Sequence, residues 1–163
     1  MIRKGNRFVR PKKPYELARI KEENVVLGKY GLKTKREIWK MQAKVDYYRK
    51  RAKALAKSSL EEQEVLFGKL RALGLDVKST ADVLALKIDD ILNRRLQTVV
   101  FNKKMATTPK HARQMIIHKK VMIDGKVNNT PSYIVPLNEE NKLTLRVNVP
   151  KKKKEEPKAE VAA

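Results

Sequence analysis

The chain has 163 residues, of which 39 are Lys or Arg and 18 are Asp or Glu, and its formal net charge is +21. A charge this far from zero argues against an ordinary neutral enzyme and favours a polyanionic partner, of which nucleic acid is the leading class. Cysteine is absent, which excludes disulfides, thiolate nucleophiles, iron–sulfur clusters and the common structural zinc sites. The sequence has no run of about 20 apolar residues that could span a membrane and no secretory signal, so we expect no membrane association.

Residues 1–14 hold six positive charges without any periodic pattern, which predicts an extended basic arm. Phe8 and Val9 in its middle favour docking on another molecule, with a solvated terminus as the alternative. The arm residues expected to contact nucleic acid are Arg3, Lys4, Arg7, Arg10, Lys12 and Lys13.

Residues 15–88 are predicted to form a helical region. A first helix should run from about Tyr15 to Gly28 or Gly31. Thr34 and Glu37 then have the spacing of a capping box that begins a longer helix. The core side of this second helix is predicted from apolar residues spaced three and four apart, which are Ile38, Met41, Val45, Tyr48, Ala52 and Leu55.

A third helix is predicted to begin at a second capping signal and to end at Gly74. Its cap is either Ser58 with Glu61 or Ser59 with Glu62.

The second helix also carries a basic face that includes two aromatic residues. Aromatic rings among cationic side chains can stack on splayed bases while the charges hold phosphates, and a purely solvated face is the alternative. The residues of this secondary candidate site are Trp39, Lys40, Lys44, Tyr47, Lys50, Arg51, Lys53 and Lys57.

Residues 93–120 contain eight positive charges and no acid. The apolar spacing predicts one helix from Ile91 to about Lys103, with Arg94 and Gln97 pointing away from its core side. Thr108 and Pro109 predict the start of a short helix that ends near His118.

The residues that follow predict a small, mainly antiparallel sheet. Asp124-Gly125 lies between two short apolar runs and is a favoured two-residue hairpin turn. Further strands are expected at residues 133–135 and 143–149, and Pro150 should end the last one. Two helices on this sheet make residues 89–150 an α+β module, followed by a disordered charged tail at residues 151–163.

This module closely resembles the RNA-binding module named for ribosomal protein S-four. The resemblance rests on the order and spacing of residues 92–101 (LNRRLQTVVF), Thr108, residues 111–113 (HAR), Ile117, residues 121–125 (VMIDG) and residues 131–133 (PSY). The preceding helices and arm are similar to the N-terminal part of the same ribosomal protein, and the archaeal type is the most similar. Because such modules also occur in pseudouridine synthases, tyrosyl-tRNA synthetases and stress proteins, the module alone does not settle the function.

The resemblance implies a non-enzymatic, cytoplasmic protein of the small ribosomal subunit. Such a protein binds ribosomal RNA early in assembly, organises an RNA junction and contributes to translational accuracy. It lies near the messenger RNA entry side beside a neighbour of the S-five type. Some bacterial members hold zinc on cysteines, but this chain has none, so we expect neither metal nor cofactor. The RNA contacts implied by the resemblance are Arg94, Arg95, Lys103, Lys104, Thr108, Lys110, His111, Arg113, Gln114, His118, Lys119 and Lys120.

Several alternatives remain open from the sequence alone. Arg95 could instead tie its helix to a sheet carbonyl. Phe101 could pack against the N-terminal helices or stack on a base. A ribosome-biogenesis factor that binds precursor or small nucleolar RNA is the second functional hypothesis. An RNA-modifying enzyme is a remote third, because residues 93–120 offer no catalytic acid.

Overall fold

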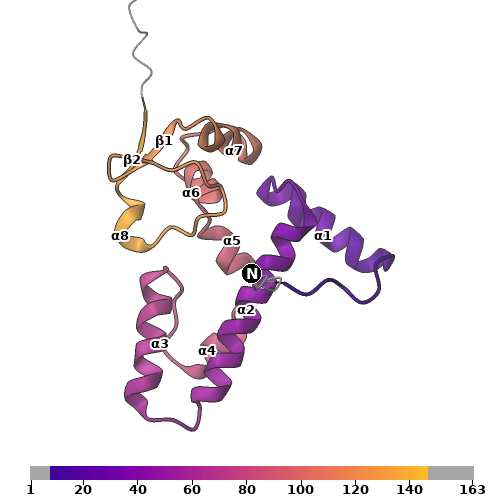
Figure 1. The fold of residues 1–163 in the computed structure, drawn as a ribbon, viewed down its shortest axis with the longest axis vertical. Helices are drawn as coiled ribbons and strands as arrows, with labels where there is room; N and C mark the ends of the chain where they lie inside the picture. Colours follow the sequence, from indigo (N-terminus) through magenta and orange to yellow (C-terminus); the bar gives the residue numbers. More distant parts are fainter. Residues whose placement is uncertain (1–7, 147–163) are drawn as a thin grey trace, which may run out of the picture.

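The computed structural model describes residues 8–146, in which the long helix α2 (Lys35–Leu55) is the central element. Helix α1 (Leu17–Tyr30) packs near one end of α2, while α3 (Leu60–Ala72) and α4 (Thr80–Ala85) pack near its other end (Figure 1). The predicted helical region is therefore present, and its three long helices lie where the apolar spacing placed them.

Three further helices connect this region to the sheet. Helix α5 (Ile88–Asn93) packs on α2 and leads into α6 (Leu96–Asn102), which packs on α7 (Pro109–Ile117). Helix α1 also contacts α7, where Gly31 at the C-terminal end of α1 lies against Pro109.

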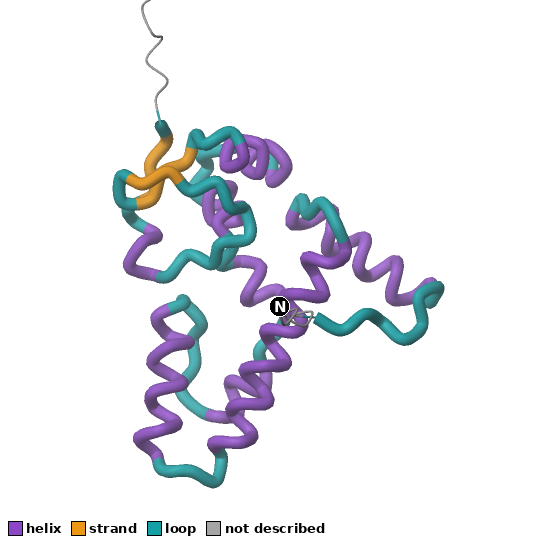
Figure 2. The backbone as a smooth tube through the Cα atoms, in the orientation of Figure 1, coloured by secondary structure: helices purple, strands orange, loops and turns teal. Residues whose placement is uncertain are grey.

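The sheet has three short antiparallel strands and is small beside the helices (Figure 2). Its strands are β1 (Val121–Ile123), β2 (Lys126–Val127) and β3 (Leu143–Leu145), in the order β2-β1-β3. A short helix, α8 (Leu137–Glu140), precedes β3. The expected α+β fold class is confirmed. Residues 147–149 of the predicted last strand, Pro150 and the tail lie outside the described residues.

The predicted hairpin turn is confirmed. Asp124 and Gly125 have φ angles of 51° and 74°, the positive values that a two-residue turn of this kind requires. The turn sets Ile123 opposite Lys126, and on the other edge Ile123 lies opposite Leu143. Val121 and Ile123 are consequently buried on one face of the sheet.

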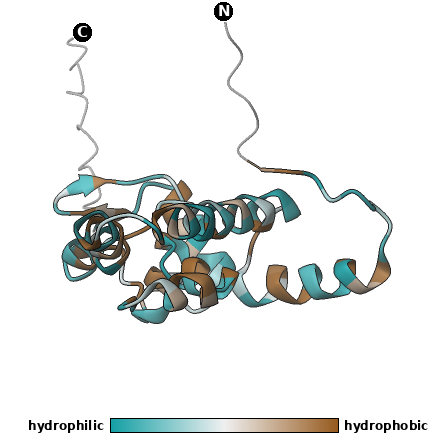
Figure 3. Ribbon diagram, turned by 90° about the horizontal axis from the view of Figure 1, so that it is seen from below, coloured by the Kyte–Doolittle hydropathy of each residue, from teal (hydrophilic) through white to brown (hydrophobic). Residues whose placement is uncertain are grey.

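The buried apolar residues form two clusters that are consecutive in the chain. The first contains residues between Tyr30 and Leu92, and the second contains residues between Leu96 and Leu143. The predicted core positions Ile38, Met41, Val45 and Ala52 belong to the first cluster, as the spacing on α2 indicated. Hydrophobic and hydrophilic residues alternate along α1 (Figure 3).

The single helix predicted for residues 91–103 is wrong, because α5 ends at Asn93 and the chain leaves the helical conformation at Arg95. Arg95 is extended, with φ −70° and ψ 142°, and forms a single β-bridge with Ile134. The Leu96 N–H donates to the Tyr133 carbonyl at 2.7 Å, and the Val135 N–H donates to the Arg94 carbonyl at 2.9 Å. The predicted strand at residues 133–135 is therefore reduced to this bridge.

Gly31 forms the corner between α1 and α2. It has φ +60°, and a β-carbon there would lie 2.9 Å from the Pro109 Cβ and 3.0 Å from the Lys110 backbone nitrogen. Only glycine combines this left-handed conformation with such close packing on α7.

Replacing Gly31 by alanine is expected to lower the free energy of unfolding by about 2 kcal/mol, from left-handed strain and the contact with Pro109. Gly28→Ala is the matched control, because Gly28 lies inside α1 with nothing within 4 Å of an added β-carbon. That control should be stabilising by about 0.5–1 kcal/mol. Urea denaturation of both variants measures the difference, and an equal effect of the two would contradict the role of the corner.

Candidate nucleic-acid interface

Helix α7 begins as predicted and exposes one long side to solvent. The Thr108 hydroxyl accepts a hydrogen bond from the His111 N–H at 3.1 Å, and Pro109 occupies the first turn. Ala112 and Ile116 are fully buried, which anchors one side of the helix in the module core.

Eight of the predicted RNA contacts are exposed along this helix and the two segments that flank it. We call them the α7 ridge: Lys104, Thr108, Lys110, His111, Gln114, His118, Lys119 and Lys120. None of the ridge lysines forms an ion pair with any residue between 8 and 146. Their charge is therefore available to an external anion.

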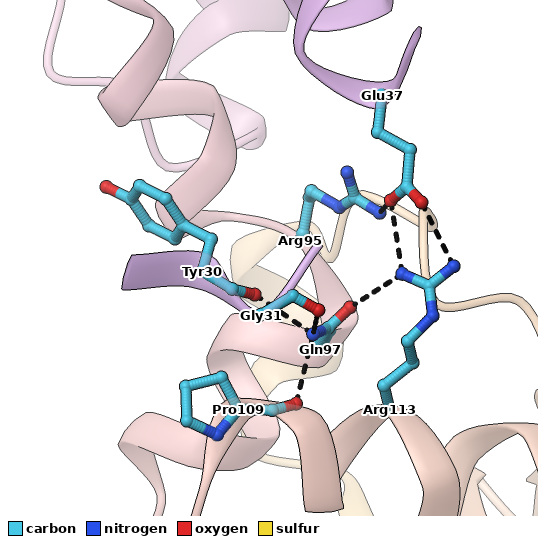
Figure 4. A network of polar contacts seen from close by, with 7 residues as sticks. All are labelled: Tyr30, Gly31, Glu37, Arg95, Gln97, Pro109 and Arg113. Carbon is cyan, nitrogen blue, oxygen red and sulfur yellow. Dashed lines mark hydrogen bonds and ion pairs between the residues drawn. The ribbon is translucent and has the colours of Figure 1, made fainter. Parts of the chain in front are cut away.

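The other four predicted contacts are held inside the protein. Arg94 donates to the Val135 carbonyl at 2.9 Å and pairs with Glu140 at 2.8 Å. Lys103 donates to the Glu140 carbonyl. Arg95 and Arg113 both bind Glu37 (Figure 4). We leave these four out of the proposed surface, because each would have to give up an internal partner to reach a phosphate.

Glu37 is the centre of a polar network between α2 and the module (Figure 4). Its carboxylate accepts a hydrogen bond from Arg95 at 2.6 Å and two from Arg113 at 3.0 and 3.2 Å. Arg95 is only 1% exposed, and its partner is the Glu37 carboxylate rather than RNA or the sheet carbonyl that was the alternative. The predicted capping box is also wrong, since the Thr34 side chain makes no cap hydrogen bond.

Gln97 links the same elements through backbone carbonyls (Figure 4). Its side-chain amide donates to the carbonyls of Tyr30, Gly31 and Pro109, each at 3.0 Å, and its oxygen accepts from Arg113 at 3.3 Å. The prediction that Gln97 points away from the core is wrong, because the residue is 1% exposed. Together with Glu37, it fixes the α1–α2 corner against α7.

The network also sets the protonation of Glu37. Burial raises the pKa of Glu37, but the hydrogen bonds and charges of Arg113 and Arg95 together lower it by more. The pKa of Glu37 therefore lies below the ordinary value of 4.5. The unfolded chain therefore binds more protons at mildly acidic pH. The stabilisation by Glu37 is complete above the unfolded pKa and is lost as the pH falls through the folded pKa.

The free energy of unfolding is therefore expected to fall as the pH drops from about 5 to about 3. A Glu37→Gln variant should show a smaller fall, because this carboxylate no longer titrates. Urea denaturation across this range measures both slopes. Glu61→Gln is the control, since Glu61 is exposed in the first turn of α3 and its loss should leave the slope unchanged. If the free energy of unfolding of Glu37→Gln depended on pH as steeply as that of the wild type, the proposed role of the Glu37 network would be contradicted.

The basic face of α2 is only partly as predicted. Its exposed members are Lys40, Lys44, Tyr47, Lys50, Arg51 and Lys53, and Lys57 is exposed just beyond the helix. Trp39, by contrast, is half-buried and donates from its indole nitrogen to Glu23 at 2.9 Å, with the Phe8 ring 6.0 Å away. The Trp39 ring is thus engaged by the protein, and Tyr47 is the exposed aromatic of this face, at 58%.

The helical repeat of α2 places some of these exposed residues along one side of the helix. Spacings of three and four place Lys40, Lys44, Tyr47 and Arg51 on one side of α2, with Lys50 at its margin and Lys53 elsewhere on the circumference. Exposed Arg36 begins the same row one turn earlier and was missed by the sequence analysis, although its spacing of four to Lys40 could have revealed it. We call Arg36, Lys40, Lys44, Tyr47 and Arg51 the α2 row.

The α2 row and the α7 ridge adjoin at the α1–α2 corner. Glu37, next to Arg36, contacts Arg113 of α7, and Gly31 packs directly on Lys110. Lys33 is exposed at this corner and was also missed. Of the arm residues, Arg10, Lys12 and Lys13 are exposed, while Arg3, Lys4 and Arg7 lie outside the described residues.

Metal-ligand clusters and membrane-spanning helices are absent from the described part of the chain. Between residues 8 and 146 there is no group of three or more His, Asp or Glu residues that could hold a metal ion. No helix in the same range is long and apolar enough to cross a bilayer.

Comparison with known proteins gives the family. The model of the S4 domain matches residues 94–141. The small ribosomal subunit protein uS4 of Methanococcus aeolicus is 44% identical over 147 residues, which cover 86% of this chain and 83% of the relative. The proteins of the same name from Methanothermobacter thermautotrophicus and Halobacterium salinarum are 42% and 40% identical, covering 88% and 82% of this chain and 87% and 80% of the relatives.

The chain belongs to the uS4 family. As a member, it is an RNA-binding structural protein of the small ribosomal subunit and is not an enzyme. Its place is in the cytoplasm, with the ribosome. The relatives named here are archaeal, as the resemblance of the whole chain indicated. The matched S4 domain contains all of the α7 ridge.

Proposed function

We propose that this uS4-family chain binds small-subunit ribosomal RNA early in assembly, organises a junction of RNA helices, and contributes to translational accuracy. The α7 ridge carries this proposal, because it combines four exposed lysines with no acidic residue anywhere in residues 93–120. A surface of this kind neutralises phosphates without reading a sequence.

The adjoining α2 row extends the proposed contact to a second RNA segment. The Glu37 and Gln97 networks hold the two surfaces in one orientation, so they select RNA segments that lie at the matching angle. We expect shape and phosphate recognition with few base-specific contacts, as is common for structured RNA.

The proposed neighbours are other small-subunit ribosomal proteins, among them one of the S-five type, and messenger RNA on its entry side. Tyr15 just before α1, and Leu17 and Val25 on α1, are exposed apolar side chains that support a protein neighbour, because exposed apolar surface is typical of protein contacts.

Salt-washed mature small subunits test the proposal. A ribosomal protein is retained at one copy per subunit, whereas a biogenesis factor is found only on precursor particles. An RNA-modifying enzyme would instead turn over isolated RNA. Loss of the protein from mature subunits at a salt concentration that keeps other proteins bound would overturn the proposed function.

Binding to the isolated ribosomal RNA should also depend steeply on salt. If about 6–10 phosphates are neutralised, affinity falls by about 10³-fold or more between 50 and 200 mM salt. A nearly flat titration in a filter-binding assay would contradict the electrostatic part of the proposal.

A further inference from the structure

A hollow of about 570 Å³ lies where the chain passes from α6 to α7. Phe101 and Met105 are half-buried and Ala106 is buried, so apolar atoms form its floor. Four exposed polar residues complete the lining, namely Asn102, Lys104, Thr107 and His111. Phe101 packs on the core of the module itself, which differs from the expected packing against the N-terminal helices and leaves its outer side on this hollow.

Lys104 on this rim has an unfavourable backbone conformation. It follows α6 with φ +57°, its N–H donates to the Phe101 carbonyl, and the Met105 N–H donates to the Val100 carbonyl. This pair of hydrogen bonds is the helix ending in which glycine is the usual residue. A lysine there is strained, and strained residues gather at functional sites.

Lys119 repeats the same arrangement after α7. Its φ is also +57°, its N–H donates to the Ile116 carbonyl, and the Lys120 N–H donates to the Met115 carbonyl. Among residues 8–146, the one further non-glycine residue with positive φ is Asp124, in the hairpin turn. The strained lysines therefore both belong to the α7 ridge, but only Lys104 lines the hollow.

We infer that this hollow binds one unstacked nucleotide of single-stranded RNA. The inference rests on the proposed function and deepens it. The base lies against Phe101 and Met105, since aromatic rings provide sequence-tolerant stacking for any base. Asn102 and Thr107 offer hydrogen bonds to base edges, and Lys104 balances the adjoining phosphate. No acidic residue lines the hollow, so nothing there repels a polyanion.

Two substitutions in the full chain separate the roles of the floor and the rim. Phe101→Leu keeps an apolar floor but removes the aromatic face, and should lower affinity for small-subunit ribosomal RNA about tenfold with an unchanged salt slope. Lys104→Gly should raise the stability of the fold but lower its affinity for RNA. The urea midpoint rises because strain is relieved, while RNA affinity falls.

Lys119→Gly is the matched control, because it relieves the same strain and removes the same charge outside the hollow. All variants are compared on protein-free small-subunit ribosomal RNA and on a blunt RNA duplex, and base reactivity is probed on the bound ribosomal RNA. We expect wild-type protein to protect one unpaired nucleotide of the RNA from the reagent. The same nucleotide should become reactive again with Phe101→Leu and with Lys104→Gly, but should stay protected with Lys119→Gly. Phe101→Leu should bind the duplex as wild type does, and Lys104→Gly should bind it more weakly only by the effect of one lost charge, as Lys119→Gly does.

Wild-type affinity and protection in both hollow variants would overturn the nucleotide site while leaving the proposed function intact. Failure of wild-type protein to bind the ribosomal RNA would instead overturn the proposed function. If Phe101→Leu does not fold, Lys104→Gly decides alone, because relief of strain cannot unfold the chain.

Discussion

Replacing Glu37 by alanine is expected to lower the free energy of unfolding by about 3–5 kcal/mol, because it leaves a buried charge without a partner. Arg95 is 1% exposed, and its Nε and Nη1 atoms have no hydrogen-bond partner among the described residues. Glu37 is thus the carboxylate that balances this guanidinium. Urea denaturation at neutral pH measures the loss.

Two further variants test this explanation. Adding Arg95→Met to Glu37→Ala should recover much of the loss, since an apolar side chain of similar length removes the unpaired charge. Glu61→Ala, in the exposed first turn of α3, should cost less than about 1 kcal/mol. A loss below 1 kcal/mol in Glu37→Ala, or no recovery in the double variant, would show that the pair is unimportant for stability.

Reversing the charge of Lys110, Lys119 and Lys120 together is expected to weaken binding to ribosomal RNA by about 10²–10³-fold at moderate salt. The salt slope should decrease by about one for each phosphate contact that is lost. All three lysines are exposed and form no ion pair within residues 8–146, so the folded state should survive. Filter binding over a range of salt concentrations gives both quantities.

The control reverses Lys151, Lys152 and Lys153 in the tail, which changes the formal charge by the same amount. Its effect on affinity should be much smaller, and equal losses would argue against a localised surface. Arg94 and Arg113 are unsuitable for this experiment although the sequence placed them in the same basic window. Both bind glutamates within the fold, so their reversal would unfold the chain rather than test RNA binding.

Local signals in the sequence were sufficient for much of the fold. Apolar spacing located α2 and its buried residues, Thr108-Pro109 located the start of α7, and Asp124-Gly125 located the hairpin. Each of these features depends on residues that are neighbours in the chain, where spacing and conformational preference determine the outcome.

The features that the sequence did not reveal depend on distant partners. Glu37 matches a capping box locally, but its actual partners lie 58 and 76 residues away. The apolar spacing of residues 91–103 is continuous, yet the backbone bends at Arg94 and Arg95 to pair with residues 133–135. A helical wheel cannot detect such pairing.

The candidate site was likewise predictable where it depends on local sequence and not where it depends on distant partners. Counting charges located the basic window, and the family resemblance pointed to Lys110, His111 and Gln114, which are exposed on α7. Counting alone could not separate these from Arg95 and Arg113, because a basic residue that binds RNA and one that binds a buried carboxylate look identical in sequence. The single Glu37 in a strongly basic stretch was the available signal, since an isolated acid among cations commonly pairs with one of them.

The order of the two core clusters has a consequence for how the protein is made. The buried residues of the first cluster end at Leu92 and those of the second begin at Leu96, and among the described residues beyond Leu96 the half-buried Ile134 is the one apolar side chain that packs against the first cluster. A nascent chain can therefore complete its N-terminal helices while the later half is still inside the translating ribosome. Glu37 stays without its arginines during this interval, and the orientation of the two RNA-binding surfaces is fixed only when Arg113 has been synthesised and has left the exit tunnel.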